Sequence, residues 1–511
     1  MRNAALCLLM LMALTLGACG DLISWTTDPS VRLRFNVDTV RFDTVITGAA
    51  SSFRDVTVYN DADDGVRIAQ VRLKKGAESP FRVNVDGQFL AGGVGQDFEI
   101  WGKDTLCMRL FVNVPADESD AIFELKDELL FTLQSGVEQR LVLTCRGMNV
   151  DILRGEVVSE DRVMDSRRPY QVFDSLVVAE GCTLTLPAGC TLMFHDKAEL
   201  VVRGTLLCPG TQEQPVTLRG DRTDRMFPYL PYDNTPNRWG GIRIEKTGRG
   251  NRLEQTDLHS ADFGIIADST DWASTNEPIL TLHNSVIHNI GGPGLVLRGT
   301  SALVTGTQVS NTRGHCVAVT GGDVRFIHCT LAQFYPFTAE RGDALHLTNR
   351  EGDVAVPLQR AHFLNCVITG YAEDVIMGDM EEKEGGDQVD YLFRNSLLRT
   401  VPSDDGQRFQ EIKYDLRDSL EIYSDKHFQT FDTYAFIYDF TPDSLSAIRG
   451  LANPQWTLPY ATDRLGRSRM ADGEPDAGAY ECVIRDDKAR RSGWSWRGTP
   501  ARKTASLSSD D

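Results

Sequence analysis

A short pattern of apolar and polar positions recurs six times between residues 253 and 398. Each copy opens with an apolar residue, has a polar or glycine residue two positions later, then a small or polarisable residue, and closes with an apolar residue. The opening residues are Leu253, Leu282, Val304, Phe326, Phe363 and Phe393, and the polar or glycine positions are Gln255, Asn284, Gly306, His328, Asn365 and Asn395. Apolar residues that alternate with variable ones have the period of a β-strand. Each copy therefore predicts a strand that bends sharply at the polar position.

A second set of apolar pairs follows the first at offsets of 12 to 19 residues. The pairs are Ile265/Ala267, Leu295/Leu297, Val317/Val319, Leu345/Leu347 and Val375/Met377. The one long offset coincides with an extra stretch, QFYPFTAERGD, at residues 333–343. Strand positions are kept while insertions fall in turns, which is typical of a solenoid whose coils contact only their neighbours. The pattern predicts a parallel β-helix over residues 151–404.

The flanking segments have different patterns. Residues 31–150 contain about seven alternating strands with turn residues such as Asp86-Gly87 between them, which predicts an Ig-like β-sandwich. After residue 404 the coil pattern is lost, and we expect residues 405–482 to close the β-helix or pack on it. Residues 483–511 are basic, with Ser, Gly and Trp between the charges, which is typical of a disordered tail. The predicted fold class is all-β, with a sandwich before a solenoid.

The first residues have the pattern of an export signal. Arg2 precedes an apolar run from Ala4 to Leu16, which is too short for a membrane-spanning helix. The sequence Leu16-Gly17-Ala18-Cys19 resembles the processing box of bacterial lipoproteins, and this resemblance implies a signal peptide at 1–18, a lipid on Cys19 and a linker at 19–30. Because no acidic residue directly follows Cys19, the resemblance also implies the outer membrane, on either its periplasmic or its cell-surface face.

Charge and cysteine usage narrow the function further. The net charge of −19 argues against nucleic acid as a partner. Nine cysteines follow Cys19, without a CxxC motif or a Cys/His cluster at zinc spacing. We expect most of them to be small buried residues, with a Cys107–Cys145 disulfide in the sandwich as an alternative.

Three segments carry a resemblance to a known family. They are TLTLPAGCTLMFHDKAELVVRGTLLCPGT at 183–211, RWGGIRIE at 238–245 and DRLGRSRMADGEPDAGAYE at 463–481. Together with the recurring coils, they resemble the right-handed parallel β-helix lipoproteins of Bacteroidota, which have a pectin lyase-like fold, and residues 31–150 resemble an Ig-like domain. The resemblance implies the fold and a place in the cell envelope. Its motifs are structural, so they do not identify a ligand.

The columns of residues expected to point outward offer no catalytic arrangement. They are Glu254, His283, Thr305, Ile327, Leu364 and Arg394; Asp257, Val286, Gln308, Thr330, Val367 and Leu397; and Ile266, Val296, Ala318, His346 and Ile376. A polysaccharide lyase would need carboxylates that hold Ca²⁺ beside an Arg or Lys base, and a glycoside hydrolase would need two or three carboxylates across a cleft. No column is acidic beyond its first member. We therefore predict no catalytic residue.

Other side chains are candidates for binding. Aromatic residues at 222–241, namely Phe227, Tyr229, Tyr232 and Trp239, suit stacking on sugars, or else form a cap over the end of the β-helix. His315 and His346 are placed to flank a groove. Asp374, Asp379 and Glu381 lie in an acidic turn that either holds Ca²⁺ or is a solvated loop. The apolar third column is expected to be covered by residues 405–480, by a partner or by a glycan.

Taken together, the sequence predicts a non-catalytic lipoprotein of the cell envelope. Its β-helix would bind a glycan or an envelope protein, and it would need no cofactor apart from Ca²⁺ if the acidic turn holds that ion. The alternative is a polysaccharide lyase or glycoside hydrolase that acts on an acidic glycan.

Overall fold

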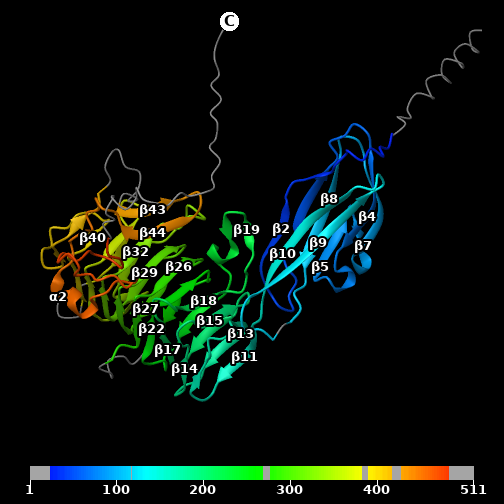
Figure 1. Cartoon of the computed structure of the whole chain (residues 1–511). Coiled ribbons are helices and arrows are strands. Elements are labelled where there is room, and N and C mark those ends of the chain that lie inside the picture. The colour runs from blue at the N-terminus through cyan, green and yellow to red at the C-terminus, as the bar shows by residue number, and fades with distance from the viewer. Residues whose placement is uncertain (1–23, 117, 269–276, 382–388, 417–426, 483–511) are drawn as a thin grey trace, which may run out of the picture.

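The computed structural model describes residues 24–482, except 117, 269–276, 382–388 and 417–426. Cys19, the linker up to residue 23 and the basic tail lie outside the described residues. Two all-β parts follow each other along the chain, a sandwich and then a long parallel solenoid (Figure 1). Among the described residues, no helix has the length and apolar character needed to cross a bilayer.

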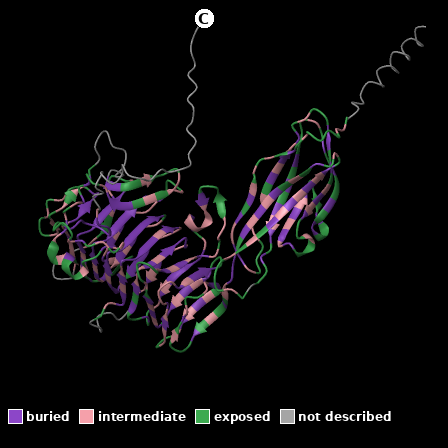
Figure 2. Ribbon diagram, viewed as in Figure 1, coloured by how far each residue is buried: buried purple, intermediate pink, exposed green. Residues whose placement is uncertain are grey.

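The first part is a sandwich of two five-stranded sheets, in the orders β1-β3-β8-β5-β6 and β2-β10-β9-β4-β7. Its elements are β1 (Arg34–Phe35), β2 (Thr39–Ile46), β3 (Arg54–Tyr59), β4 (Val66–Leu73), η1 (Gly76–Glu78), β5 (Phe81–Val85), β6 (Gln88–Phe89), η2 (Ala91–Gly93), β7 (Val94–Ile100), β8 (Thr105–Val112), β9 (Phe123–Leu133) and β10 (Glu138–Met148). Alternate residues are buried along the strands, which gives the striped pattern of Figure 2. The predicted Ig-like sandwich is confirmed. Cys107 is exposed while Cys145 is buried, and both are free thiols, so the alternative of a disulfide between them is wrong.

The second part is a parallel β-helix with three strands in each complete coil. We name the three columns of stacked strands A, B and C. Column A contains β12 (Arg162–Val163), β14 (Thr183–Thr185), β17 (Thr205–Pro209), β22 (Asn251–Glu254), β25 (Leu280–His283), β28 (Ser301–Thr305), β31 (Gly322–Ile327), β36 (Leu358–Leu364), β39 (Val389–Arg394) and β41 (Phe409–Gln410). Column B contains β15 (Thr191–Phe194), β18 (Val216–Gly220), β23 (Thr256–His259), β26 (Val286–Ile290), β29 (Gln308–Thr312), β32 (Thr330–Gln333), β37 (Val367–Gly370), β40 (Leu397–Leu398) and β42 (Lys413–Tyr414).

Column C contains β16 (Glu199–Val202), β21 (Gly241–Ile244), β24 (Ile265–Ala267), β27 (Leu295–Arg298), β30 (Val317–Thr320), β33 (Leu345–Thr348) and β38 (Ile376–Asp379). Two longer strands, β11 (Asp151–Val158) and β13 (Tyr170–Val178), begin the solenoid, and β13 pairs with both β15 and β16. Short elements project from the coils: β19 (Arg225–Phe227), β20 (Leu230–Pro231), η3 (Tyr232–Asn234), β34 (Arg350–Glu351) and β35 (Val354–Ala355).

Equivalent residues of successive coils lie in register inside the solenoid. Leu253, Leu282, Val304, Phe326, Phe363 and Phe393 form one file across six strands of column A. The rings of Phe326 and Phe363 stack with centroids 4.9 Å apart, and those of Phe363 and Phe393 are 5.0 Å apart. This stacking buries a continuous apolar core, so the predicted strand pattern is confirmed for column A.

The polar corner between columns A and B has a left-handed backbone in all six copies. The φ angles are +44° at Gln255, +49° at Asn284, +57° at Gly306, +52° at His328, +55° at Asn365 and +49° at Asn395. Gly and Asn adopt this region most readily, which explains their frequency there. The next residue is small, and its hydroxyl or thiol donates to the carbonyl two residues back, as Ser285 does to His283 at 3.0 Å and Cys366 does to Leu364 at 3.3 Å. The predicted bend is confirmed.

Column C differs from the prediction at its last strand. Leu345 pairs with Ile376 and His346 pairs with Met377, so β38 is shifted by one residue from the expected register. The Asp374 carboxylate accepts a hydrogen bond from the Ile376 N–H at 3.1 Å, which orders the turn before this strand. Met377, rather than Ile376, therefore continues the outward row, and Ile376 packs against the core.

Residues 427–482, which we name the C-terminal cover, lie against the outside of the coils. The cover contains β43 (Phe428–Asp432), β44 (Ile437–Pro442), α2 (Pro454–Thr457) and η6 (Leu458–Tyr460). Its apolar residues, which include Phe428, Phe440, Ala477, Ala479 and Tyr480, pack on Ala332, Val367 and Leu397 of column B. The amide of Asn365 holds the corner to Asn453, accepting from its N–H at 2.8 Å and donating to its carbonyl at 3.1 Å.

The position of the cover divides the outer surface of the solenoid. We name the outward side of column B and its corner the covered face, and the outward row of column C, namely Ile266, Val296, Ala318, His346 and Met377, the open face. The described apolar residues of the cover lie on the covered face, so the expectation that this segment packs over the column C row does not match its observed contacts. On the open face Val296 is buried, Ile266, Ala318 and His346 are half-buried, and Met377 is exposed.

Candidate functional site

The aromatic residues of the loop at 222–241 have two different environments. Phe227 and Tyr229 are 49% and 54% exposed, and their rings are nearly parallel with centroids 5.7 Å apart. Trp239 is fully buried, stacks on Phe194 at 4.3 Å, and donates its indole N–H to a backbone carbonyl. Tyr232 is half-buried, with the Arg222 guanidinium 3.9 Å from its ring centroid. The loop thus presents two rings to solvent and uses the other two to pack against the coils.

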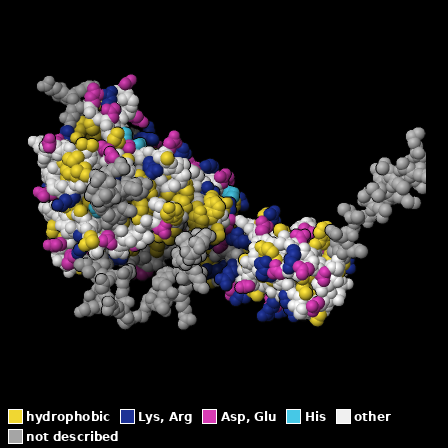
Figure 3. Space-filling view, turned by 90° about the horizontal axis from the view of Figure 1, so that it is seen from above, with side chains coloured by type: hydrophobic (Ala, Val, Ile, Leu, Met, Phe, Trp, Pro, Cys, Tyr) yellow, Lys and Arg dark blue, Asp and Glu magenta, His cyan; other side chains and the backbone are white. Residues whose placement is uncertain are grey.

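Two rings from distant segments extend this pair. The Phe436 ring lies 6.4 Å from that of Tyr229 with an interplanar angle of 15°, and the Phe337 ring lies 5.2 Å from that of Phe436 with an angle of 11°. We name Phe227, Tyr229, Phe436 and Phe337 the aromatic row. Hydrophobic side chains also gather in the space-filling view of the upper face of the β-helix domain, on the side toward the sandwich (Figure 3).

Three local structures place the members of the row. Phe227 and Tyr229 lie on the β19–β20 hairpin, which projects beside the sandwich (Figure 1). Phe436 lies in the turn between β43 and β44 with a φ of +56°, and the Asp432 carboxylate accepts two backbone N–H groups of that turn. Phe337 lies in the insertion at 333–343, whose Tyr335 is buried. The sequence signalled the insertion but not the meeting of these segments.

Carboxylates beside the open face are paired with basic residues of neighbouring coils or turns. Glu199 contacts Arg243 at 3.3 Å, and Asp268 contacts Arg298 at 3.1 Å. A third pair joins Glu245 to Arg203 at 2.8 Å. A neighbouring guanidinium group favours the ionised form of a carboxylate. Such a carboxylate is poorly suited to donate a proton to a leaving group.

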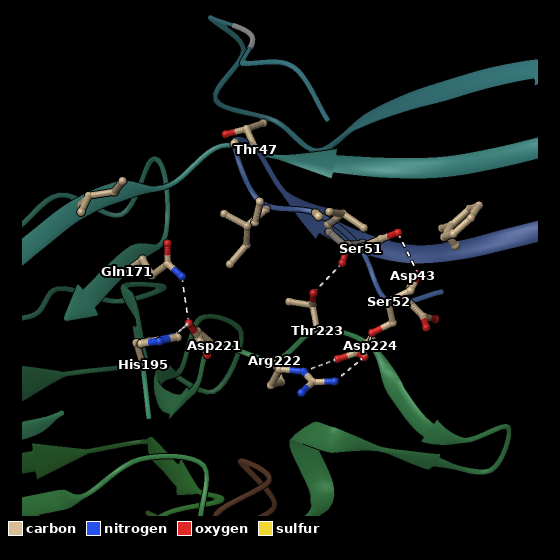
Figure 4. A pocket seen from close by; sticks show the side chains of 18 of the residues that line it. Asp43, Thr47, Ser51, Ser52, Gln171, His195, Asp221, Arg222, Thr223 and Asp224 are labelled. Atoms are coloured by element: carbon tan, nitrogen blue, oxygen red, sulfur yellow. Dashed lines mark hydrogen bonds and ion pairs between the residues drawn. The ribbon is translucent and has the colours of Figure 1, made fainter. Parts of the chain in front are cut away.

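A cavity of about 460 Å³ lies between the sandwich and the first coils (Figure 4). Its polar side chains pair with one another: Asp221 accepts from Gln171 and contacts His195 Nδ1, each at 2.8 Å. Burial opposes the charge of Asp224, but hydrogen bonds from Arg222 and Ser52 lower the pKa of its carboxyl. Thr223 donates to the Thr44 carbonyl at 2.5 Å, and Ile46, Met148 and Met193 form an apolar contact nearby. The cavity is therefore the polar joint between the two parts of the chain.

Two groups of His and Asp side chains in the described part of the chain are close enough to share a metal ion. The first lies on the covered face. His259 Nδ1 is 2.8 Å from Asp257 and Nε2 is 2.9 Å from Asp233, while His288 Nε2 is 3.3 Å from Asp257. Burial of the His259 ring opposes its charge, but the carboxylates of Asp233 and Asp257 raise its pKa to about 10. Both ring nitrogens of His259 are already within hydrogen-bond distance of carboxylates, so this group forms a charge network.

The second group joins both histidines that the sequence singled out. The His315 and His346 rings stack with centroids 4.6 Å apart, and both Nδ1 atoms face the Asp343 carboxylate, at 3.1 and 3.5 Å. Burial, followed by the neighbouring His346, lowers the pKa of His315. Asp343 was not singled out from the sequence, although it lies in the conspicuous insertion at 333–343.

The residues of the acidic turn take separate partners. Asp374 accepts from a backbone N–H of its own turn, Asp379 is exposed, and Glu381 is paired with Arg350. Glu382 and Glu384, two further acidic residues of this stretch, lie outside the described residues. The Ca²⁺ site stays a prediction.

No protein-family model matches the sequence, and no curated protein does. Among solved structures, the E. coli chaperone DraB matches at 15% identity and a TM-score of 0.16, over 23% of this chain and 55% of that one. The PapD-like domain 7 of human CEP192 matches at 13% identity and a TM-score of 0.17, over 26% of this chain and 96% of that one. The N-terminal domain of PorA matches at 12% identity and a TM-score of 0.18, over 23% and 97%. The match spans little more than half of DraB and of the periplasmic chaperone SfaE.

Proposed function

We propose that this chain is a lipid-anchored protein of the outer membrane whose β-helix domain binds a glycan chain without cleaving it. The single observation that carries the proposal is the aromatic row. Its exposed rings, Phe227 and Tyr229, continue into two more rings of nearly parallel plane, which come from other segments. Sugar rings present flat faces of C–H groups, so a line of aromatic rings can contact consecutive sugars of one chain.

The anchor part of the proposal rests on the sequence around Cys19. A lipid on that residue would hold the sandwich near the membrane and place the solenoid beyond it. In this arrangement the sandwich is a spacer. The paired polar groups between the two parts would restrict the movement of the solenoid relative to the sandwich. An anchored, non-enzymatic binder of this kind would retain a polymer at the cell envelope.

The absence of cleavage is supported by the carboxylates of the surface. Glu199 and Asp268 beside the open face are held by Arg, and Asp343 faces two histidines. The carboxyl whose pKa is raised to about 8, Glu481, is buried in the C-terminal cover. A glycoside hydrolase needs one carboxyl of raised pKa facing the substrate and a second across the cleft. The described residues near the aromatic row offer no such pair.

The test is a binding assay with the purified mature protein and a panel of acidic and neutral polysaccharides. We expect at least one polysaccharide to be retained in affinity electrophoresis. We expect Phe227→Ala/Tyr229→Ala to lose most of that retention, because stacking on one aromatic ring contributes on the order of 1 kcal/mol. Phe89→Ala is the matched control, since Phe89 is also 49% exposed but lies in the sandwich. This control should bind as the parent does.

The same incubations measure cleavage. New reducing ends or unsaturated sugars, formed by the parent and abolished by replacing one carboxylate, would show that the chain is an enzyme and that the non-catalytic proposal is wrong. Retention that is equal in the double variant and the parent would remove the aromatic row as the binding surface. Retention of purified envelope proteins, but of no polysaccharide, would assign the surface to a protein partner instead.

A further inference from the structure

The group on the open face has the composition of a metal site. His315 precedes β30, Asp343 ends the insertion, and His346 lies on β33, where its row neighbours are Ala318 and Met377. The three side chains are between a quarter and about a third exposed, so the group is open to solvent. Two imidazoles and one carboxylate are ligands that Zn²⁺, Co²⁺, Ni²⁺ and Fe²⁺ accept.

The spacing also suits a metal ion. Bonds of about 2.0–2.1 Å to nitrogen and oxygen in a tetrahedral site place the ligand atoms about 3.3 Å apart. Asp343 Oδ2 is 3.1 Å from His315 Nδ1 and 3.5 Å from His346 Nδ1, and the three ligand atoms lie within 4.8 Å of one another.

One ring nitrogen of the group has no hydrogen-bond partner in the described part of the chain. His346 Nδ1 is buried and has no hydrogen-bond partner among the described residues, although it faces a carboxylate. His315 Nδ1 accepts the Asp343 N–H at 3.0 Å, so metal binding would exchange this one hydrogen bond for a metal bond. A buried nitrogen without a partner is costly, and a cation between it and the carboxylate would satisfy both.

We propose that His315, Asp343 and His346 bind a divalent transition metal ion such as Zn²⁺ on the open face of the β-helix. Three protein ligands leave at least one coordination position for water or for an oxygen of a bound molecule. The ion would also join two neighbouring coils across the insertion at 333–343. The covered group does not compete, because both nitrogens of His259 already face carboxylates. This proposal stands without the glycan proposal.

The test uses the full mature chain without an affinity tag, treated with a chelator and then titrated with Zn²⁺ or Co²⁺. We expect one equivalent to bind, a Co²⁺ spectrum without thiolate charge-transfer absorption, and a higher thermal midpoint in saturating Zn²⁺, because an ion that binds only the folded state stabilises it. His346→Ala and Asp343→Asn should each weaken binding by at least about tenfold, since even outer partners of metal ligands contribute that much.

The two site variants are chosen so that a loss of metal binding cannot be attributed to misfolding. His346→Ala places in β33 the residue that occupies the same row in β30, Ala318, and Asp343→Asn keeps the side-chain shape. His362→Ala is the matched control, since His362 also faces a carboxylate, Asp390, at 3.3 Å, but has no third ligand among the described residues. Unchanged binding in both site variants, a thiolate signal from the exposed Cys107, or no saturable binding by the parent would each overturn the proposal.

Discussion

The covered face and the open face are built by the same coils, yet they treat polar side chains differently. On the covered face, His259 is fixed between Asp257 and Asp233, and Arg464 of the C-terminal cover approaches Asp257 at 3.9 Å. On the open face, two half-exposed histidines share one carboxylate, and one of their nitrogens is left without a hydrogen bond. The buried His259 has a carboxylate at each ring nitrogen, whereas the two partly exposed histidines of the open face share a single carboxylate.

The difference follows from burial. A charged group under the cover cannot be hydrated, so it must be paired within the protein, and the cost of leaving it unpaired is high. A group on the open face keeps water as an alternative partner, so it can stay incompletely paired and remain able to bind something else. An uncovered outward row of a solenoid can therefore keep side chains available to a ligand.

The largest effect should come from the buried charge that holds the cover together. Arg469 is fully buried, donates to the carbonyls of Gly478 and Ala479 at 3.1 Å each, and lies 3.8 Å from Glu481. Arg469→Met should lower the free energy of unfolding by about 3–5 kcal/mol, because it leaves the buried carbonyls of Gly478 and Ala479 without their donors and removes the cation beside Glu481. Urea denaturation followed by fluorescence measures this loss.

The matched change on the open face is Arg298→Met. Arg298 is 45% exposed and contacts Asp268 at 3.1 Å, so its replacement should cost less than about 1 kcal/mol. Equal losses in the two variants would mean that the cover does not bury its charges more effectively than the open face does, and the comparison would fail.

The second effect is the pH dependence of the covered group. The pKa of His259 is raised from 6.5 to about 10, so the stability it contributes is fully present below pH 6.5 and is lost as the pH rises toward 10. The difference in unfolding free energy between the parent and His259→Gln should therefore shrink between pH 7 and 10, by at most about 1.4 kcal/mol per pH unit. Urea midpoints at a series of pH values measure it.

Asp233→Asn sharpens this test. It removes one of the two carboxylates that raise the pKa of His259 and leaves Asp257 in place. The decline in stability should then begin at a lower pH than in the parent. A difference that is constant from pH 7 to 10 for His259→Gln would show that the ring is neutral in the folded protein.

The fold could be predicted from the sequence because its signals are local and repeated. Alternation of apolar residues gave the strands, and an Asn or Gly at a left-handed corner marked the same bend in each coil, as at Asn284 and Gly306. The predicted register was wrong by one residue at β38. This strand is the last of column C, so no later coil helps to fix its register, and the turn at Asp374 shifts it.

The candidate site was predictable only in part because its members are distant in sequence. Phe227 and Tyr229 were selected because they are aromatic residues of one loop. The same criterion also selected Trp239, which is buried and stacks on Phe194. Phe436 joins the aromatic row only because the C-terminal cover folds back onto the coils. The cover has no sequence repeat from which this position could be predicted. Asp343 was not predicted because the insertion changes the spacing between the two coils, so the residue of the next coil that lies beside His315 cannot be found by counting. A register argument across the insertion would have paired them.

The smallest expected effect is the change in unfolding free energy when a histidine of the open face is replaced. In the presence of a chelator, His346→Ala should change the free energy of unfolding by less than about 0.5 kcal/mol, because the side chain is partly exposed and the row already contains Ala318 one coil earlier. Urea denaturation of both proteins measures the difference. A loss above about 2 kcal/mol would mean that the ring supports the coils as the buried groups of the covered face do. A near-zero change, beside a large loss for Arg469→Met, would instead show that the histidines of the open face are kept for something other than the stability of the fold.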